Sequence, residues 1–310
     1  MRLAIIDIGT NTINLAIASI HDEQYQIIYS SKEAARLGRG GINEGKLTAD
    51  AINRGLTAIG NHVDTISKFN VDQTIAIGTS ALRNCNNGHN FCEMVKQKFN
   101  VDVHIISGDE EAQLIFDGVK QVMPIGQDRV LILDIGGGSC EFIIANKNGI
   151  IWKQSFELGM ARLIDKYNPS DPIAPSEIKA IEMYLRSELA PLYEALHNYP
   201  TTTLIGTSGS FDTIAAIVAA MKHPYLNVKL STSYNIRVAN FEEVHRKIIA
   251  STAQQRAEMP QMDKSRIDII VLGSLFINFI VREMRIEHIF QCGYALKQGA
   301  IYQFINGTLK

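Results

Sequence analysis

Runs of apolar residues alternate along the chain with segments in which apolar positions recur every three or four residues. Residues 3–8 and 130–134 are almost entirely apolar, which is typical of strands buried on both faces of a sheet. After Thr48, isoleucine, leucine and valine recur at helical spacing from Ile52 to Ile66. This alternation predicts an α/β protein whose buried strands are connected by amphipathic helices.

The same patterns predict most of the remaining elements. Further strands are predicted at residues 13–20, 25–30, 74–77, 101–106, 140–146, 150–156, 203–206 and 288–291. Helices are predicted to start at Thr48, Thr79 and Ser107 and to cover residues 89–99, 210–221, 241–251, 264–284 and 295–305. A long helix is predicted after Pro175, with a kink at Pro191.

Two segments of the chain occur twice, in the same order and at nearly the same spacing. Residues 2–12 align with residues 129–139, and each copy is an apolar strand that ends in aspartate and a turn of small residues. The sequence IGTS at residues 77–80 recurs at residues 205–208. We infer two related α/β halves, each of which delivers an aspartate and a small-residue turn to a shared cleft.

The boundary between the halves is predicted close to the restart of the repeat. Pro124 and Gly126 interrupt regular structure there and offer a hinge. We therefore expect one domain at residues 1–125 and a second at 126–310. The final predicted helix, residues 295–305, is expected to pack back on the first domain.

Composition narrows the function classes. The chain has 310 residues, a hydrophobic fraction of 46% and a net charge of −2, without a long block of lysine and arginine, which disfavours a nucleic-acid partner. The most apolar stretch, residues 267–281, contains Asp268 and Asn278 and is shorter than the ~20 apolar residues that a membrane span needs. We expect a buried helix there, and the segment 264–284 is apolar enough to supply a homodimer face.

The spacing of the cysteines and the first residues of the chain indicate in which compartment of the cell the protein is expected. The chain opens with a predicted strand in place of a signal peptide, and its histidines and cysteines lack zinc spacing. We therefore expect a cytoplasmic protein with free thiols at Cys85, Cys92, Cys140 and Cys292.

The segment from Asp134 to Glu141 is the first candidate for chemistry. Three consecutive glycines at residues 136–138 let the backbone turn sharply and bring several N–H groups close to an anion. Asp134 can hold Mg²⁺, Ser139 offers a hydroxyl to a phosphate, and Glu141 adds a second carboxylate. The alternative interpretation is a glycine-rich hairpin turn without a ligand.

The first copy of the loop carries hydroxyl and amide side chains in place of glycines. Asp7 is followed by Gly9, Thr10 and Asn11, whose polar groups suit a phosphate or a metal-bound water. Asparagine and threonine also favour ordinary hydrogen-bonded turns. The repeat with Asp134 is what favours a functional role over a turn.

A helix start near residue 107 offers two neighbouring carboxylates. Ser107 and Glu110 match a capping box, which is a sufficient structural reason for Glu110. Glu111 is not needed for capping, so its carboxylate is a candidate to orient and deprotonate a water that attacks phosphorus. Its alternative role is a favourable charge on the helix dipole.

Two further loops follow strands and begin helices. The amides of Thr79 and Ser80, together with Arg83, can hold a phosphate, although a lone arginine is more often a surface residue. The sister loop at residues 207–210 is a second candidate anion site.

These segments, in this order, resemble the exopolyphosphatase / guanosine pentaphosphate phosphohydrolase (Ppx/GppA) family. The matching sequences are DIGTNT from Asp7, ARLGRGG from Ala35, GTSALRN from Gly78, ISGDEEA from Ile106, DIGGGSCE from Asp134 and GTSGS from Gly206, with a weaker likeness in GYALKQGAI from Gly293. The resemblance covers nearly the whole chain. It implies two duplicated actin-like, sugar-kinase-like domains of the ribonuclease H-like type, with a cleft between them.

The resemblance also implies roles for individual residues. Glu111 matches the second glutamate of the motif EEA and would activate water, Arg83 would bind the phosphate under attack, and Asp7, Asp134 and Glu141 would organise Mg²⁺. The candidate phosphate-binding residues are Asp7, Gly9, Thr10, Asn11, Thr79, Ser80, Gly136, Gly137, Gly138, Ser139, Thr207, Ser208, Gly209 and Ser210.

The implied activity is Mg²⁺-dependent hydrolysis of a terminal phosphoanhydride bond in inorganic polyphosphate or guanosine pentaphosphate. The sequence does not choose between these two substrates, because both present the same terminal anhydride. A small-molecule kinase of the same fold and a non-catalytic sensor of phosphorylated nucleotides are the alternatives.

The chain departs from the family pattern at several positions. Cys140 replaces a usual threonine, Gln113 and Asn14 replace arginines, and Lys297 and Gln298 replace a usual Arg-Glu pair. Two lost arginines reduce the positive field along a substrate channel, and longer relatives add helical domains that help to grip polymer. We therefore expect weak processivity or a preference for short substrates.

Overall fold

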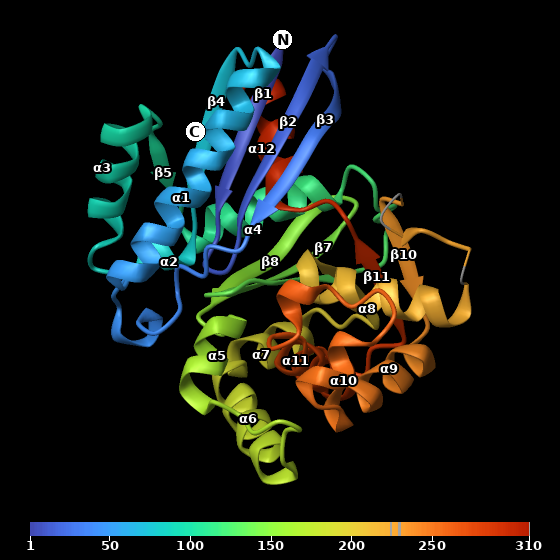
Figure 1. Cartoon of the computed structure of the whole chain (residues 1–310). Helices are drawn as coiled ribbons and strands as arrows, with labels where there is room; N and C mark the ends of the chain where they lie inside the picture. Colours follow the sequence, from blue (N-terminus) through green and yellow to red (C-terminus); the bar gives the residue numbers. More distant parts are fainter. Residues whose placement is uncertain (224, 229–230, 310) are drawn as a thin grey trace.

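The computed structural model describes residues 1–223, 225–228 and 231–309, and it contains two mixed sheets (Figure 1). The first sheet has the strand order β3-β2-β1-β4-β5. Its strands are β1 (Arg2–Ile8), β2 (Ile13–His21), β3 (Gln24–Glu33), β4 (Gln73–Gly78) and β5 (Val103–Ile105).

The second sheet has the strand order β10-β11-β9-β6-β7-β8. Its strands are β6 (Val130–Ile135), β7 (Cys140–Asn146), β8 (Gly149–Phe156), β9 (Thr203–Thr207), β10 (Ser233–Ile236) and β11 (His288–Cys292).

The two sheets repeat one topology. Read from β8, the second sheet runs β8-β7-β6-β9-β11, which matches β3-β2-β1-β4-β5, with β10 added at the edge. In both sheets the first three strands form antiparallel pairs, the fourth pairs in parallel with the central strand, and the fifth pairs in parallel with the fourth. The predicted duplicated α/β fold of the actin-like type is therefore confirmed, and β1 and β6 occupy equivalent central positions.

Helices of the first half cover both faces of its sheet. They are α1 (Ala49–Ile66), α2 (Ser80–Asn84), α3 (Gly88–Phe99) and α4 (Gly108–Val119). The helices α1 and α3 share one core with the first sheet, as the apolar pattern from Ile52 to Ile66 predicts. The helix α4 lies on the opposite side and also packs against β7 and β8 of the second sheet.

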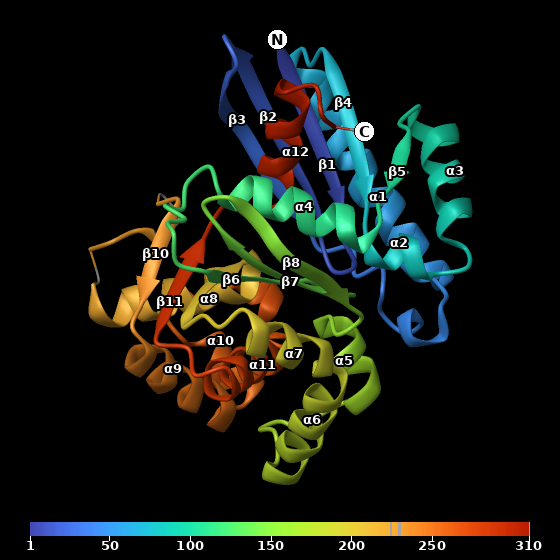
Figure 2. The same ribbon diagram turned by 180° about the vertical axis from the view of Figure 1, so that it is seen from behind.

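The final helix, α12 (Leu296–Ile305), packs against α4 and β1. Figure 2 shows from behind that α12 lies over the first sheet and that α4 crosses between this sheet and β8. A shared core joins Leu3 and Ile5 of β1 to Ile132 of β6 through residues of these two helices. The ends of β1 and β6 are thereby held close to each other.

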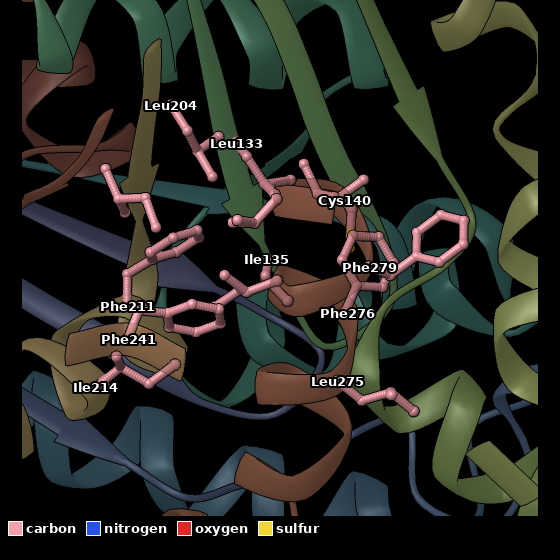
Figure 3. Packing of buried hydrophobic residues seen from close by; sticks show 14 of the residues in the cluster. Leu133, Ile135, Cys140, Leu204, Phe211, Ile214, Phe241, Leu275, Phe276 and Phe279 are labelled. Atoms are coloured by element: carbon pink, nitrogen blue, oxygen red, sulfur yellow. The ribbon is translucent and has the colours of Figure 1, made fainter. Parts of the chain in front are cut away.

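The second half has a larger helical layer around one core. Its helices are α5 (Met160–Tyr167), α6 (Pro175–Glu188), α7 (Ala190–Asn198), α8 (Ser208–Lys222), α9 (Val238–Ala250), α10 (Ala253–Ala257) and α11 (Ile270–Glu283). Side chains of α8, α9 and α11 pack with those of the second sheet, and Figure 3 shows Phe276 and Phe279 of α11 in this cluster.

The structure differs from the sequence-based prediction in several short elements and at Pro191. The helices α5 and α10 and the strand β10 were not predicted, because none is longer than eight residues and a period is hard to recognise over so few positions. Pro191 does not kink a continuous helix: α6 ends at Glu188, and Pro191 lies in the first turn of α7, where its missing N–H costs nothing.

The segment 264–284 is not an exposed dimer face. It divides into a 3₁₀ turn (Lys264–Arg266) and α11, and Leu275, Phe276 and Phe279 of α11 are at most 1% exposed. Its apolar residues are used inside the core of the second half. Among the helices of the described residues, none has both the length and the apolar character that crossing a bilayer requires.

Candidate active site

The loops that follow β1 and β6 meet at a cavity of about 460 Å³. Both loops close in the same way, since the N–H of Gly9 donates to Thr12 O and the N–H of Gly136 donates to Ser139 O, each at 3.0 Å. The two loops touch: a Cβ added at Gly138 would lie 2.5 Å from Thr10 Oγ1. Only glycine therefore permits this approach.

Most of the predicted site residues border this one cavity. Those that line it are Asp7, Gly9, Thr10, Asn11, Thr79, Ser80, Glu111, Asp134, Gly136, Gly137, Gly138, Ser139, Ser208 and Gly209. Arg83, Glu141, Thr207 and Ser210 lie behind the lining. The repeated aspartates, Asp7 and Asp134, thus face a common space, as the duplicated sequence predicts.

Asp7 and Asp134 form a buried, mutually repulsive pair. Burial raises the pKa of both carboxyls, and the charge of Asp7 raises the pKa of Asp134 further. Asn14 Nδ2 donates to Asp7 Oδ2 at 3.0 Å, while the side chains of Ser208 and Thr207 oppose the rise at Asp134. A cation bound next to both carboxyls would favour their ionised forms.

The donor set suits a hard divalent cation. Mg²⁺ usually takes one or two carboxylates from the protein and completes its shell with water and phosphate oxygens. Asp7 and Asp134 are such a pair at the cavity wall. Within the described residues, no group of three or more His, Cys, Asp or Glu side chains is arranged to hold a metal. The protein would therefore supply two ligands and leave the remaining positions to substrate and water.

Glu111 lies at the start of α4 and is 8% exposed. The predicted capping box is confirmed, with the Glu110 N–H 3.2 Å from Ser107 Oγ and the Ser107 N–H 2.8 Å from Glu110 Oε2. Burial raises the pKa of Glu111 to about 7, against the lowering effect of Arg83 and with the help of Asp134 and Asp7. A carboxylate with this pKa is matched to proton transfer at neutral pH.

Arg83 fixes the orientation of Glu111. Its Nη1 donates to Glu111 Oε2 and to Ile106 O, each at 2.9 Å. Its Nη2 is buried and has no hydrogen-bond partner among the described residues, and the same holds for Thr10 Oγ1. Buried polar atoms without a partner are uncommon, so these two groups suit an oxygen-rich ligand.

Glu141 lies beneath the cavity wall and is 1% exposed. Its Oε1 accepts a hydrogen bond from Ser155 Oγ at 2.7 Å. Burial, together with the charges of Glu111 and Asp134, raises the pKa of Glu141 well above its ordinary value. This carboxyl therefore lies beneath the loop and is not among the groups that border the cavity.

Several charged residues of the cavity were not assigned from the sequence. Lys32 of β3 forms an ion pair with Asp263 of the second half. Arg266 lies over Gly209, where an added Cβ would be 1.8 Å from a guanidinium nitrogen. Asp212 accepts a hydrogen bond from Gln291 at 2.8 Å. Of these residues, only Asp212 could have been noticed in the sequence, because it lies one turn into the helix that follows the loop at residues 207–210.

Lys297 appeared in the sequence only as a departure from the family pattern, but it borders the cavity. Burial lowers the pKa of this ammonium, and the carboxylates of Asp7 and Asp212 oppose that change. Together with Lys32 and Arg266, it gives the cavity three cationic side chains.

Cys140, another departure, is fully buried at the start of β7, and its Sγ lies 3.5 Å from Leu158 O. It belongs to the core of the second half (Figure 3) and not to the cavity. All four cysteines are free, as predicted.

A duplicated α/β fold with a polar cavity between two copies of one loop defines a class of phosphate-handling enzymes. The sequence profile of the Ppx/GppA phosphatase family matches residues 16–307. The chain therefore belongs to the Ppx/GppA phosphatase family, and the protein is a hydrolase of the phosphatase class.

Comparison with individual proteins agrees with this assignment. A crystal structure of an exopolyphosphatase from Cytophaga hutchinsonii is similar with a TM-score of 0.96 and 36% identity, covering 99% of this chain and 98% of that one. Exopolyphosphatase 2 of Mycobacterium tuberculosis is 27% identical over an alignment of 299 residues, which covers 92% of this chain and 91% of the relative. The Aquifex aeolicus member of the Ppx/GppA family shares the fold, with a TM-score of 0.80 and 21% identity over 99% and 98% of the two chains.

Proposed function

We propose that the protein hydrolyses the terminal phosphoanhydride bond of inorganic polyphosphate or guanosine pentaphosphate, with Mg²⁺ as cofactor. The observation that carries this proposal is the position of Glu111, which lines the same cavity as Asp7, Asp134 and both small-residue loops and has a pKa of about 7. The names of the relatives supply the substrate class. The test is whether the protein releases phosphate from both substrates. A kinase would instead transfer the phosphate to an added acceptor.

In this mechanism Glu111 accepts the proton of the water that attacks the terminal phosphorus. Arg83 holds the base in place through Nη1 and has Nη2 available for a phosphate oxygen. The N–H groups of residues 137–139 surround the phosphate, and such donors stabilise charge that develops in the transition state. Mg²⁺ held by Asp7 and Asp134 would neutralise phosphate oxygens.

The pH dependence of the reaction follows from the pKa of Glu111. The base must be ionised, so kcat/KM is expected to fall tenfold for each pH unit below its pKa. A cation at Asp7 and Asp134 stabilises the charged form, which places the midpoint between the ordinary value of 4.5 and about 7. Initial rates from pH 4 to pH 9 measure this, and a kcat/KM that stays flat through the acidic range would remove Glu111 as the base.

Chain length is expected to matter because an ion pair joins the two halves at the cavity. Lys32 and Asp263 come from different halves and both line the cavity, so a long polymer has to displace their contact. We expect shortened chains to accumulate early during digestion of long polyphosphate. Asp263→Asn is expected to raise kcat/KM for long chains by no more than about fivefold, since exposed ion pairs are weak, and to leave tripolyphosphate unchanged. Tight retention of very long polymer by the wild-type protein would contradict this expectation.

A further inference from the structure

The glycine-rich loop after β6 is held from behind by the start of α5. The carbonyl groups of residues 136, 137 and 138 accept hydrogen bonds from the N–H groups of residues 160, 161 and 159 at 3.1, 2.7 and 3.3 Å. A peptide group is planar, so each carbonyl directed at α5 turns the N–H of the following residue to the opposite side. These N–H groups belong to residues that line the cavity. The helix start therefore sets the shape of the phosphate loop.

Arg162, in the first turn of α5, ties this loop to the first half of the protein. Its Nε donates to Gly138 O at 2.8 Å, its Nη1 to Ile42 O at 3.2 Å and its Nη2 to Glu157 Oε2 at 2.6 Å. Asn43 Nδ2 donates to Arg162 O at 3.1 Å. The side chain of Arg162 is 14% exposed. The planar guanidinium of Arg162 thus contacts the phosphate loop and Glu157 in the second half, and the 3₁₀ turn that contains Ile42 in the first half.

Glu157 makes a second connection between the halves. The oxygen that pairs with Arg162 also accepts a hydrogen bond from Ser80 Oγ at 3.1 Å. Ser80 begins α2 of the first half and in turn accepts a hydrogen bond from Asn84 Nδ2 at 3.1 Å. Gly138 lies directly against Ser80, so the contact between Ser80 and Glu157 also reaches the phosphate loop.

We propose that Arg162 is a positioning residue that couples the contact between the two halves to the shape of the phosphate loop. Arg162 and Glu157 do not line the cavity, so they act on bound phosphate through Gly138. When the halves meet, Ile42 O and Ser80 orient the guanidinium and the carboxylate, and the loop carbonyl is held. When they part, Gly138 loses this restraint and its neighbours' N–H groups lose their alignment. The catalytic consequence rests on the proposed function.

Hydrogen–deuterium exchange of the apoprotein tests the coupling without any turnover. In Arg162→Met, amides of residues 136–142 are expected to exchange about tenfold faster, the effect of losing one hydrogen bond from a charged donor. Asn43→Ala, which touches Arg162 only from the first half, is expected to accelerate the same amides about threefold. Arg186→Met is the matched control, because Arg186 pairs with Glu283 at 2.7 Å in the same half and contacts no loop residue.

Unchanged loop exchange in Asn43→Ala would overturn the coupling. Asn43→Ala loses only one exposed hydrogen bond and is expected to fold. It therefore tests the coupling even if Arg162→Met does not fold. Equal acceleration in the Arg186→Met control would overturn the proposal as well, because the effect would then be general loss of stability.

Kinetics with tripolyphosphate tests the catalytic consequence. A displacement of about 1 Å in a catalytic group can reduce the rate about 100-fold, and we expect this loss in kcat for Arg162→Met with KM within about threefold. Arg162→Lys reaches only one of the three acceptors at a time and is expected to recover part of kcat. Faster loop exchange with an unchanged kcat would overturn the positioning role. A wild-type protein that hydrolyses no phosphoanhydride would refute the proposed function and leave the exchange result to decide the coupling.

Discussion

Glu111→Gln is expected to lower kcat for phosphate release from tripolyphosphate about 10³-fold. General bases typically contribute ~10² to 10⁴-fold to a rate, and glutamine removes the base while it preserves the size of the side chain. The amide oxygen still accepts the hydrogen bond from Arg83 Nη1, so the arginine keeps its place. KM is therefore expected to change much less than kcat. Steady-state phosphate release with Mg²⁺ in excess measures both constants.

The neighbouring glutamate provides the control. Glu110→Gln makes the same chemical change in the same turn of α4, at a residue whose carboxylate caps the helix through Ser107. Glutamine also serves in a capping box, so activity and stability are expected to stay near those of the wild type. If Glu111→Gln retains wild-type activity, or if Glu110→Gln loses as much, the assignment of the base is wrong.

Asp134→Asn is expected to have opposite effects on activity and on the stability of the metal-free protein. Loss of one of two carboxylates at the proposed cation site should lower kcat/KM about 10³-fold, an effect that several kcal/mol of lost charge stabilisation explains. Burial and Asp7 raise the pKa of Asp134. The folded state therefore binds the proton more tightly than the unfolded state, and stability is lost as pH rises through the two pKa values. Asparagine removes this penalty at neutral pH.

Thermal unfolding separates the two effects. In EDTA, Asp134→Asn is expected to melt at a higher temperature than the wild type at pH 7.5. Mg²⁺ should raise the melting temperature of the wild type, because it binds only the folded state, and should raise that of the variant far less. Asp50→Asn, an exposed aspartate in the first turn of α1, is the control. A variant that responds to Mg²⁺ as fully as the wild type would contradict a metal role for Asp134.

The repeated motifs allowed much of this arrangement to be predicted from the sequence. The apolar strands that lead to Asp7 and Asp134 are central strands whose apolar residues are buried, and such near-continuous apolar runs are typical of strands covered on both faces. Because the two copies occupy equivalent places in equivalent sheets, the sequence also predicted that both aspartates face one space. The capping box at Ser107 left Glu111 as the unexplained carboxylate, and it lies in the cavity.

The supporting residues could not be predicted, for a physical reason. Arg162 lies on a helix of only eight residues whose N-cap, Gly159, makes no side-chain hydrogen bond, so no capping residue marks its start. Its partners Ile42 and Gly138 are far from it in the sequence, and both contribute backbone carbonyls that no residue type encodes. Lys297 reaches the cavity only because α12 packs back across the first sheet. Such contacts depend on the tertiary arrangement and not on local pattern.

The central claim is that two copies of one loop bind a chain of linked phosphates in a single cavity, next to a base. A crystal structure of Glu111→Gln with tripolyphosphate and Mg²⁺ tests it most directly. We expect the terminal phosphate to lie against the N–H groups of residues 137–139, within hydrogen-bond distance of Arg83, with the metal between Asp7 and Asp134. Tripolyphosphate bound outside this cavity, or with its terminal phosphate remote from residue 111, would contradict the account.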